Sequence, residues 1–175
     1  MVAHVPHAST FIPPTAHELL RLDDSALHRQ LVRMTDWDTE DLFSWALDLG
    51  RSIFVNRVSR LVMDPERFAD DDEEPMSGRG QGVVYTKTTD GGPLALIDAE
   101  ERERRIRDLY EQPYHAALTG IVTSMLDEFG AGLILDCHSF ATVPLPSELN
   151  QEPDRPDICV GSDPFHTPPA LVAGL

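Results

Sequence analysis

Cysteines are scarce in this sequence, and long apolar runs are absent. Only Cys137 and Cys159 occur, too few for a disulfide framework. Both lie in apolar runs, so we expect two buried free thiols in a reducing cytoplasm. No stretch approaches the ~20 apolar residues of a membrane span, and the first ten residues lack the basic and apolar regions of a secretory signal. These absences favour a cytoplasmic globular protein that does not insert into membranes.

Basic residues are also few. The 175 residues include 14 Lys and Arg against 30 Asp and Glu, a formal net charge of −16. This charge repels the phosphates of nucleic acids and anionic membrane surfaces, so neither is an expected partner. A small acidic substrate therefore needs a local group of arginines. Part of the acidic excess lies in the run 70–74, for which we predict a solvated loop.

Several common site motifs are missing. The sequence has no GxxxxGK[ST] or GxGxxG loop, no HExxH and no CxxC. It also has no GxSxG elbow, although Ser139 follows His138 directly, and this argues against a serine hydrolase. Nucleotide-binding loops, zincin helices and redox pairs are thereby set aside.

Apolar patterning predicts strands that alternate with helices. Helices are expected from about residue 16, over 41–49 with Gly50 as its stop, and over 106–129 with Pro113 kinking or dividing it. Strands are expected at 1–5, 52–56, 60–64, 132–136 and 157–161, and a further pairing segment at 83–86. The run 132–136 does not alternate, which is typical of a strand buried on both faces. We therefore predict an α/β fold, a three-layer sandwich with a largely parallel or mixed sheet, in one domain over 1–175.

Two histidines follow predicted strands. His7 comes after the first strand and His138 after the strand at 132–136. Ligands bind beyond the carboxyl ends of strands in α/β sheets, so these imidazoles are candidate metal ligands. A single histidine is more often a packed or surface residue, but two at strand exits point to a shared site.

A third ligand is needed, because a catalytic zinc ion takes three protein donors and leaves one position open. The segment 36–41 offers four carboxylates where one helix ends or another begins. Asp36 and Glu40 are four residues apart and would share a helix face. Asp36 could equally cap a helix, and both readings stay open here.

Three arginines fall within 57–67: Arg57, Arg60 and Arg67. The planar guanidinium fork suits recognition of carboxylates. An internal ion pair, such as Arg60 with Asp64, is the competing explanation for one of them. We expect an anion-binding group here.

Seven short segments occur in an order that resembles the N-formylglutamate amidohydrolase family. They are Val-Pro-His-Ala-Ser (5–9), Thr-Asp-Trp-Asp-Thr-Glu (35–40), Ser-Arg-Leu-Val-Met-Asp (59–64), Thr-Thr-Asp-Gly (88–91), Pro-Tyr-His-Ala-Ala-Leu (113–118), Asp-Cys-His-Ser (136–139) and Asp-Ile-Cys-Val-Gly (157–161). The resemblance implies a phosphorylase/hydrolase-like fold and hydrolysis of N-formyl-L-glutamate in histidine degradation.

The resemblance also implies roles for individual residues. His7 and His138 correspond to metal-binding histidines, with Zn²⁺ as the expected ion, and Asp36 is the preferred acidic ligand with Glu40 in reserve. Arg60, and with it Arg57, is expected to bind the substrate carboxylates. Asp136 is expected to orient His138.

The chain departs from the family in its length. The resemblance implies that family members continue for roughly another hundred residues and carry a late glutamate; in related zinc exopeptidases a late glutamate is the general base. A truncated product and a short family member are both compatible with the sequence, and the base would then come from 36–41, with Glu40 as candidate, or from outside the chain. The alternatives are a related N-acyl-amino-acid deacylase and an inactive domain that binds metal and amino acid.

Overall fold

The computed structural model describes residues 1–174 and is built around a parallel three-stranded sheet. The central strand β1 (Val2–Val5) pairs with β2 (Ser52–Val55) on one side and β3 (Ile134–Asp136) on the other. Val2 is level with Ser52 and Ile134 in the two ladders. All four residues of β1 are buried, as expected for a strand with a partner on each edge and a helix layer on each face.

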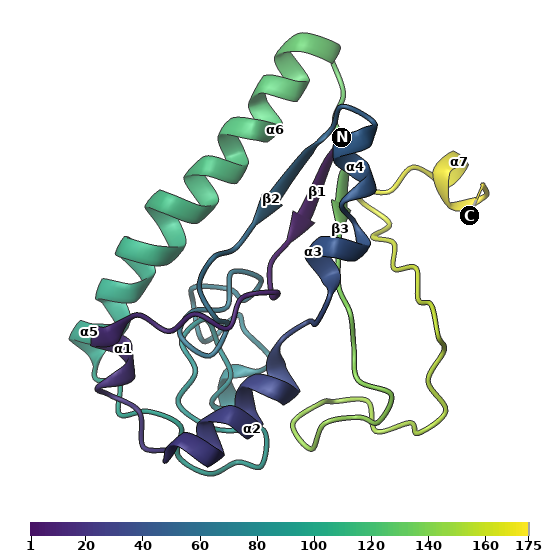
Figure 1. Ribbon diagram of the computed structural model, residues 1–175. Helices are drawn as coiled ribbons and strands as arrows, with labels where there is room; N and C mark the ends of the chain where they lie inside the picture. Colours follow the sequence, from purple (N-terminus) through teal and green to yellow (C-terminus); the bar gives the residue numbers. More distant parts are fainter. Residues whose placement is uncertain (175) are drawn as a thin grey trace.

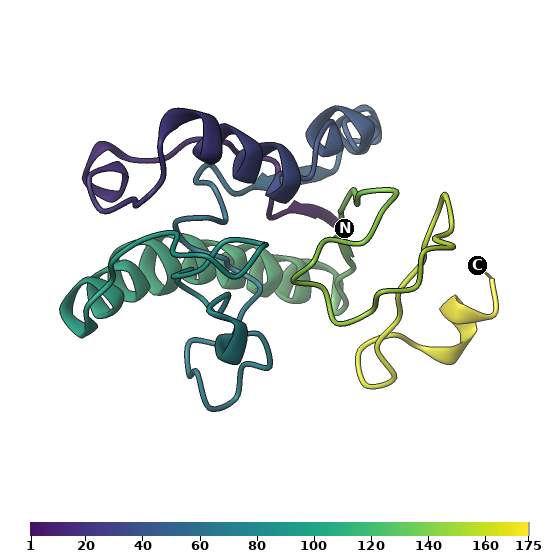
Figure 2. The ribbon, with the colours of Figure 1, turned by 90° about the horizontal axis from the view of Figure 1, so that it is seen from below.

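Helices cover both faces of the sheet (Figures 1 and 2). One layer contains α1 (Pro14–His17), α2 (Asp24–Met34), α3 (Thr39–Leu42) and α4 (Trp45–Asp48). The opposite layer is a continuous helix made of α5 (Ala99–Arg105), η2 (Ile106–His115) and α6 (Ala116–Phe129). The short η1 (Ser77–Arg79) lies in the long connection, and α7 (Pro169–Val172) lies out beyond β3. The predicted three-layer α/β architecture is confirmed.

Pro113 neither ends nor divides the long helix. The helix passes through a ten-residue π-helical stretch, η2, that contains Pro113, and then returns to α-helical geometry. A proline has no N–H to donate, and the wider π turn accommodates the lost hydrogen bond. Gly130 ends α6 with φ of 68°, and Gly50 follows α4 with φ of 66°, as predicted.

Two predicted strands near the middle of the chain are turns. Residues 60–64 form turns in which Leu61, Val62 and Met63 are fully buried. Residues 83–86 are also irregular and buried, and the amide of Asp64 donates to the carbonyl of Val83 at 2.8 Å. Their apolar character reflects burial in an irregular core, a pattern that a short apolar run cannot distinguish from a strand.

The predicted strand at 157–161 is also wrong. Ile158 is 82 % exposed and Val160 62 % exposed, and the segment makes no backbone ladder with the rest of residues 1–174. A strand needs a neighbour for its N–H and C=O groups. Cys159 is exposed for the same reason, so only Cys137 is the buried thiol that we expected.

The predicted helix at 41–49 is two short helices. Of the face expected to pack, Ala46 is buried, while Leu42 and Leu49 are more than half exposed. The acidic run is not wholly solvated either, because Glu74 is buried and accepts hydrogen bonds from the amides of Phe68 and Met76. No helix within residues 1–174 is long and apolar enough to cross a membrane.

Candidate metal centre

The parallel pairing of β1 with β3 brings the two strand-exit histidines together. His7 lies two residues beyond β1 and His138 two residues beyond β3, at the same edge of the sheet. Their ring centroids are 5.3 Å apart. His7 is 3 % exposed, whereas the His138 side chain is 37 % exposed.

Asp36 joins the two rings from the end of α2. Its amide donates to the carbonyl of His7 at 3.0 Å, and the next turn begins at Asp38, which has a left-handed φ of 59°. The Asp36 Oδ2 atom lies 2.9 Å from His138 Nδ1 and 3.7 Å from His7 Nδ1. Burial raises the pKa of this carboxyl, but the hydrogen bond with His138 and the nearby His7 imidazole outweigh it and lower the pKa to about 2. Asp36 is therefore an anion facing the Nδ1 edges of both imidazoles.

Asp64 holds the opposite edge of His7. The His7 Nε2 donates to Asp64 Oδ1 at 2.8 Å, and Asp64 Oδ2 accepts from Arg60 and from the hydroxyl of Tyr85, both at 2.7 Å. Burial raises the pKa of the Asp64 carboxyl, but Arg60 and His7 hold it well below its usual range. Arg60 is thus engaged by Asp64, in the internal ion pair that the sequence left open.

The Nδ1 atom of His7 is the clearest sign of a metal position. It is buried and has no hydrogen-bond partner among the described residues. With Nε2 donating to Asp64, Nδ1 of the neutral imidazole carries a lone pair on the side of Asp36. Donors of a tetrahedral zinc ion at ~2.1 Å are separated by about 3.4 Å, and the two distances from Asp36 lie on either side of that value. His7, Asp36 and His138 therefore suit a zinc ion in donor chemistry, and the distances from Asp36 to the two imidazoles are close to those of zinc ligands.

Glu66 offers a second donor set that the sequence did not predict. Its Oε2 lies 3.4 Å from Nε2 of His7 and 3.4 Å from Nε2 of His138, and ligand atoms of these three residues lie within 4.8 Å of one another. His115 Nε2 lies 3.0 Å from the carbonyl of Pro65 and so holds the backbone directly before Glu66. The charged Asp-Pro-Glu-Arg segment 64–67 is the feature of the sequence that could have indicated Glu66 as a ligand.

Asp136 lies behind His138, where it was expected. Its Oδ2 is 3.4 Å from His138 Nε2, and its Oδ1 accepts from His4 Nδ1 at 2.7 Å. Burial lowers the pKa of the His138 imidazole, but Asp136, Asp36 and Glu66 raise it to about 12. A metal ion at His138 must therefore displace a firmly held proton.

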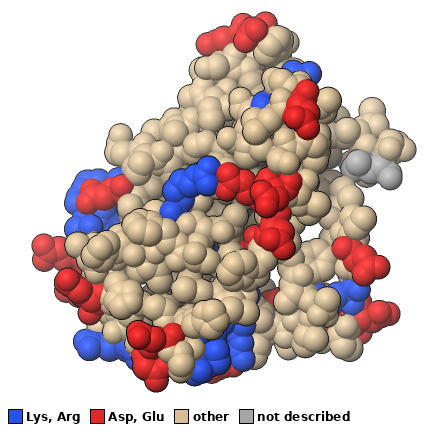
Figure 3. Space-filling view, viewed as in Figure 1, with Lys and Arg blue, Asp and Glu red and all other residues tan. Residues whose placement is uncertain are grey.

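Glu40 and Arg57 are placed apart from these residues. Arg57 donates to Glu40 through both terminal nitrogens, at 2.8 and 3.1 Å, and the side chains are 70 % and 44 % exposed. Figure 3, viewed from the same side as Figure 1, shows acidic side chains beside a basic patch near the middle of the molecule. Neither residue lines the cavity beside the histidines. The catalytic role predicted for Glu40 and the substrate role predicted for Arg57 thus gain no support from their positions.

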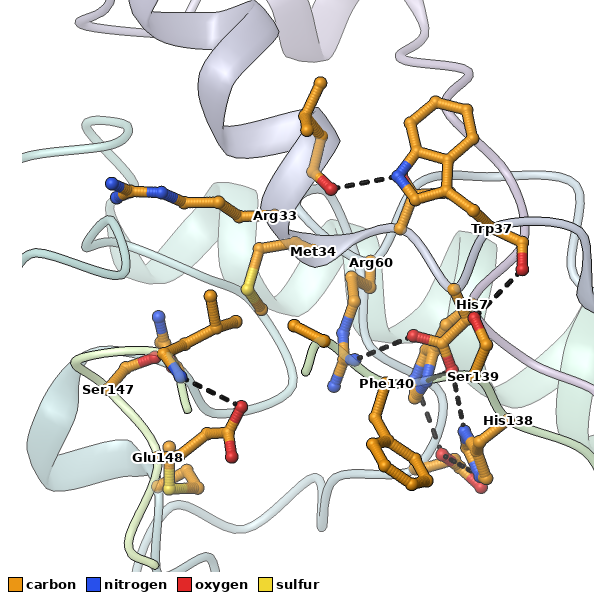
Figure 4. Close-up of a pocket in the computed structure, with 18 of the residues that line it drawn as sticks. His7, Arg33, Met34, Trp37, Arg60, His138, Ser139, Phe140, Ser147 and Glu148 are labelled. Carbon is orange, nitrogen blue, oxygen red and sulfur yellow. Dashed lines mark hydrogen bonds and ion pairs between the residues drawn. The ribbon is translucent and has the colours of Figure 1, made fainter. Parts of the chain in front are cut away.

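A cavity of about 590 Å³ opens beside the imidazoles (Figure 4). Arg60 and Arg67 line it together with Glu66 and the two histidines. The Arg67 Nε is buried without a hydrogen bond within the described chain, and its ion pairs with Asp64 and Glu74 are long, at 3.5 and 3.9 Å. Arg67 therefore has donor capacity left for an anion. The apolar part of the lining is Val32, Met34, Trp37, Met76, Phe140, Ala141 and Leu145.

Comparison with known proteins identifies relatives of this chain. The N-formylglutamate amidohydrolase family model matches residues 1–175. An N-formylglutamate deformylase of Pseudomonas putida is 33 % identical over 109 residues, which cover 60 % of this chain and 40 % of the relative. One of Pseudomonas aeruginosa is 31 % identical over 144 residues, which cover 79 % and 51 %.

A solved structure also matches. The crystal structure of N-formylglutamate amidohydrolase from Ralstonia eutropha JMP134 has a TM-score of 0.65 and 25 % identity, over 77 % of this chain and 51 % of that one. The chain spans about half the length of the relatives that it matches. By the family model and by these relatives, the chain belongs to the N-formylglutamate amidohydrolase family.

Proposed function

We propose that this chain hydrolyses the amide bond of an N-formyl acidic amino acid, N-formyl-L-glutamate, with a zinc ion held by His7, Asp36 and His138. The observation that carries the proposal is the buried, unpartnered Nδ1 of His7, which faces the same Asp36 oxygen as Nδ1 of His138 among the described residues. The names of the relatives support the substrate. Bound there, a divalent cation supplies a Lewis acid for the amide carbonyl and activates water.

The residues of the chain divide the remaining work. We assign to Glu66, which lies 3.4 Å from the Nε2 atoms of both histidines and lines the cavity, the role of accepting the proton of the attacking water and returning it to the leaving amine. Glu66 thereby takes the role that the sequence suggested for Glu40. Arg67 binds a substrate carboxylate with its remaining donors, while Arg60 holds Asp64 and lines the cavity beside it.

The direct test is release of formate from N-formyl-L-glutamate by the purified chain, with zinc content measured on the same sample. We expect zinc-dependent turnover, loss of zinc in Asp36→Asn, and retained zinc with strongly reduced turnover in Glu66→Gln. Asp163→Asn, an exposed position far along the chain, is the control and should change neither. No stoichiometric zinc in the wild type and no effect of His138→Ala would contradict the proposal.

A related deacylase is the second candidate. The apolar wall of the cavity, which includes Phe140 and Leu145, could bind an acyl group larger than formyl. Rates on N-acetyl- and N-formyl-L-glutamate, measured side by side, separate the two. An inactive binding domain would retain zinc and hydrolyse neither. The place in histidine degradation and the cytoplasmic location are retained as predictions.

A further inference from the structure

The π-helical stretch η2 presents a buried tyrosine to the back of the sheet. Tyr114 is 5 % exposed, and its hydroxyl contacts Nε2 of His4, which is 6 % exposed in the middle of β1. The rings of Phe54 and Tyr114 pack at 5.0 Å beside them. π-helical turns occur frequently at functional sites, so the contact between Tyr114 and His4 is a candidate for a functional role.

The contact continues through His4 to Asp136. His4 and Asp136 are level in the β1–β3 ladder, and His4 Nδ1 is 2.7 Å from Asp136 Oδ1. A carboxylate only accepts, so Nδ1 carries the hydrogen and Nε2 is left as the acceptor. The Tyr114 hydroxyl therefore donates to Nε2. Both nitrogens of His4 are occupied, and the Asp136 carboxylate is fixed although half of its side chain is exposed.

The other oxygen of Asp136 faces the candidate metal ligand. Asp136 Oδ2 lies 3.4 Å from Nε2 of His138. In this structure Nδ1 of His138 donates to Asp36 at 2.9 Å. If the proposed zinc ion replaces that hydrogen, a hydrogen on Nε2 directed at Asp136 fixes Nδ1 as the atom that binds the metal, on the side of Asp36. Outer partners of this kind orient a metal-binding imidazole and fix its tautomer.

We propose that Tyr114 and His4 are positioning residues, which act through Asp136 to hold His138 in the orientation and tautomer that bind the metal. The proposal rests on the proposed function in placing the metal at Nδ1 of His138. Tyr114 belongs to η2, whose helix layer lies on the face of the sheet opposite α2 (Figure 2).

A second cation is the competing explanation for the same residues. Ligand atoms of His4, Glu66 and Asp136 also lie within 4.8 Å of one another. A ligand needs a free lone pair, and the hydrogen bonds to Tyr114 and Asp136 leave His4 none. The geometry therefore favours support of one metal site over a second site.

The test is the zinc affinity of the full chain, measured by competition with a chromophoric chelator in the absence of substrate. Tyr114→Phe removes one oxygen and should weaken zinc binding about 10-fold, the lower end of the range for outer partners of metal ligands. Tyr110→Phe is the matched control. The Tyr110 hydroxyl, on the same π-helical stretch, donates to the carbonyl of Arg67 and lies outside the chain of contacts to His138. The zinc affinity of Tyr110→Phe should therefore stay within about twofold of wild type.

Variants of His4 separate positioning from packing. His4→Asn keeps an amide donor near the place of Nδ1 and should retain most of the affinity that His4→Phe, with only a stacking ring, loses. Zinc content is determined in parallel. Equal affinities in wild type, Tyr114→Phe and His4→Phe would overturn the proposal. So would two zinc ions per wild-type chain that fall to one in His4→Phe. Because no substrate is used, failure of formate release with this affinity pattern intact refutes the proposed function and leaves the present inference standing.

Discussion

The two histidines of the candidate metal centre occupy unequal positions in the sheet. His7 follows β1, which is buried along its whole length between two strands, and is itself nearly inaccessible. His138 follows β3, an edge strand whose residues Ile134 and Asp136 are exposed. The two imidazoles nevertheless face the same Asp36 oxygen.

The two histidines reach similar positions beside Asp36, but different kinds of interaction hold them there. His7 is held by the interior of the protein, through the fully buried Asp64 with its partners Arg60 and Tyr85. His138 has less burial and depends on polar contacts with Asp36, Asp136 and Glu66. We therefore expect substitutions on the His7 side to cost stability and those on the His138 side to cost mainly metal affinity.

The largest effect is expected at Asp64. Asp64→Asn removes one partner of a buried charge pair and leaves Arg60 without compensation, at a cost of about 3–5 kcal/mol in the free energy of unfolding. Asp90→Asn is the control, because Asp90 pairs with Arg33 at 2.5 Å on the surface. It should cost about 1 kcal/mol or less. Urea unfolding measures both, and similar losses would remove the distinction between the two sides.

An intermediate effect is expected from the strands themselves. Val5→Ala empties fully buried space in β1 and should cost about 2 kcal/mol, from lost apolar burial and a residual cavity. Ile134→Ala removes a larger group from β3, yet Ile134 is 45 % exposed. Its cost should stay under about 1 kcal/mol. The expectation fails if the β3 variant unfolds at the lower urea concentration.

The smallest perturbation is thiol labelling, which probes the same contrast without a mutation. Burial raises the pKa of Cys137, between Asp136 and His138, to about 11. Since the thiolate is the reactive form, Cys137 should label slowly at pH 8 and faster as the pH rises toward 11. Cys159 is exposed and should label first. Peptide mapping after timed alkylation distinguishes them, and equal rates would mean that β3 opens readily.

The sequence identified the parts of the site that depend on strand position. His7, His138 and Asp136 follow or end parallel strands, so their convergence could be predicted from apolar runs alone. Glu66 could not, because residues 60–67 reach the site through buried turns that resemble a strand in composition. Glu40 has the right chemistry near the right segment, but the turn at Asp38 carries it to the surface, where Arg57 pairs with it.

The π-helical stretch has a consequence for the phase of the long helix. Each residue advances an α-helix by about 100°, so the extra residue in a π turn resets which side chains point at the sheet. Deleting one residue ahead of Tyr114 would shift the phase of the helix and rotate either α5 or the Tyr114–His115 pair by about 100°. Arg105, buried at the end of α5, would then keep its hydrogen bond to the carbonyl of Val62 only if Tyr114 lost its contact with His4. The π-helical stretch thus allows one helix to make both the Arg105 contact with Val62 and the Tyr114 contact with His4.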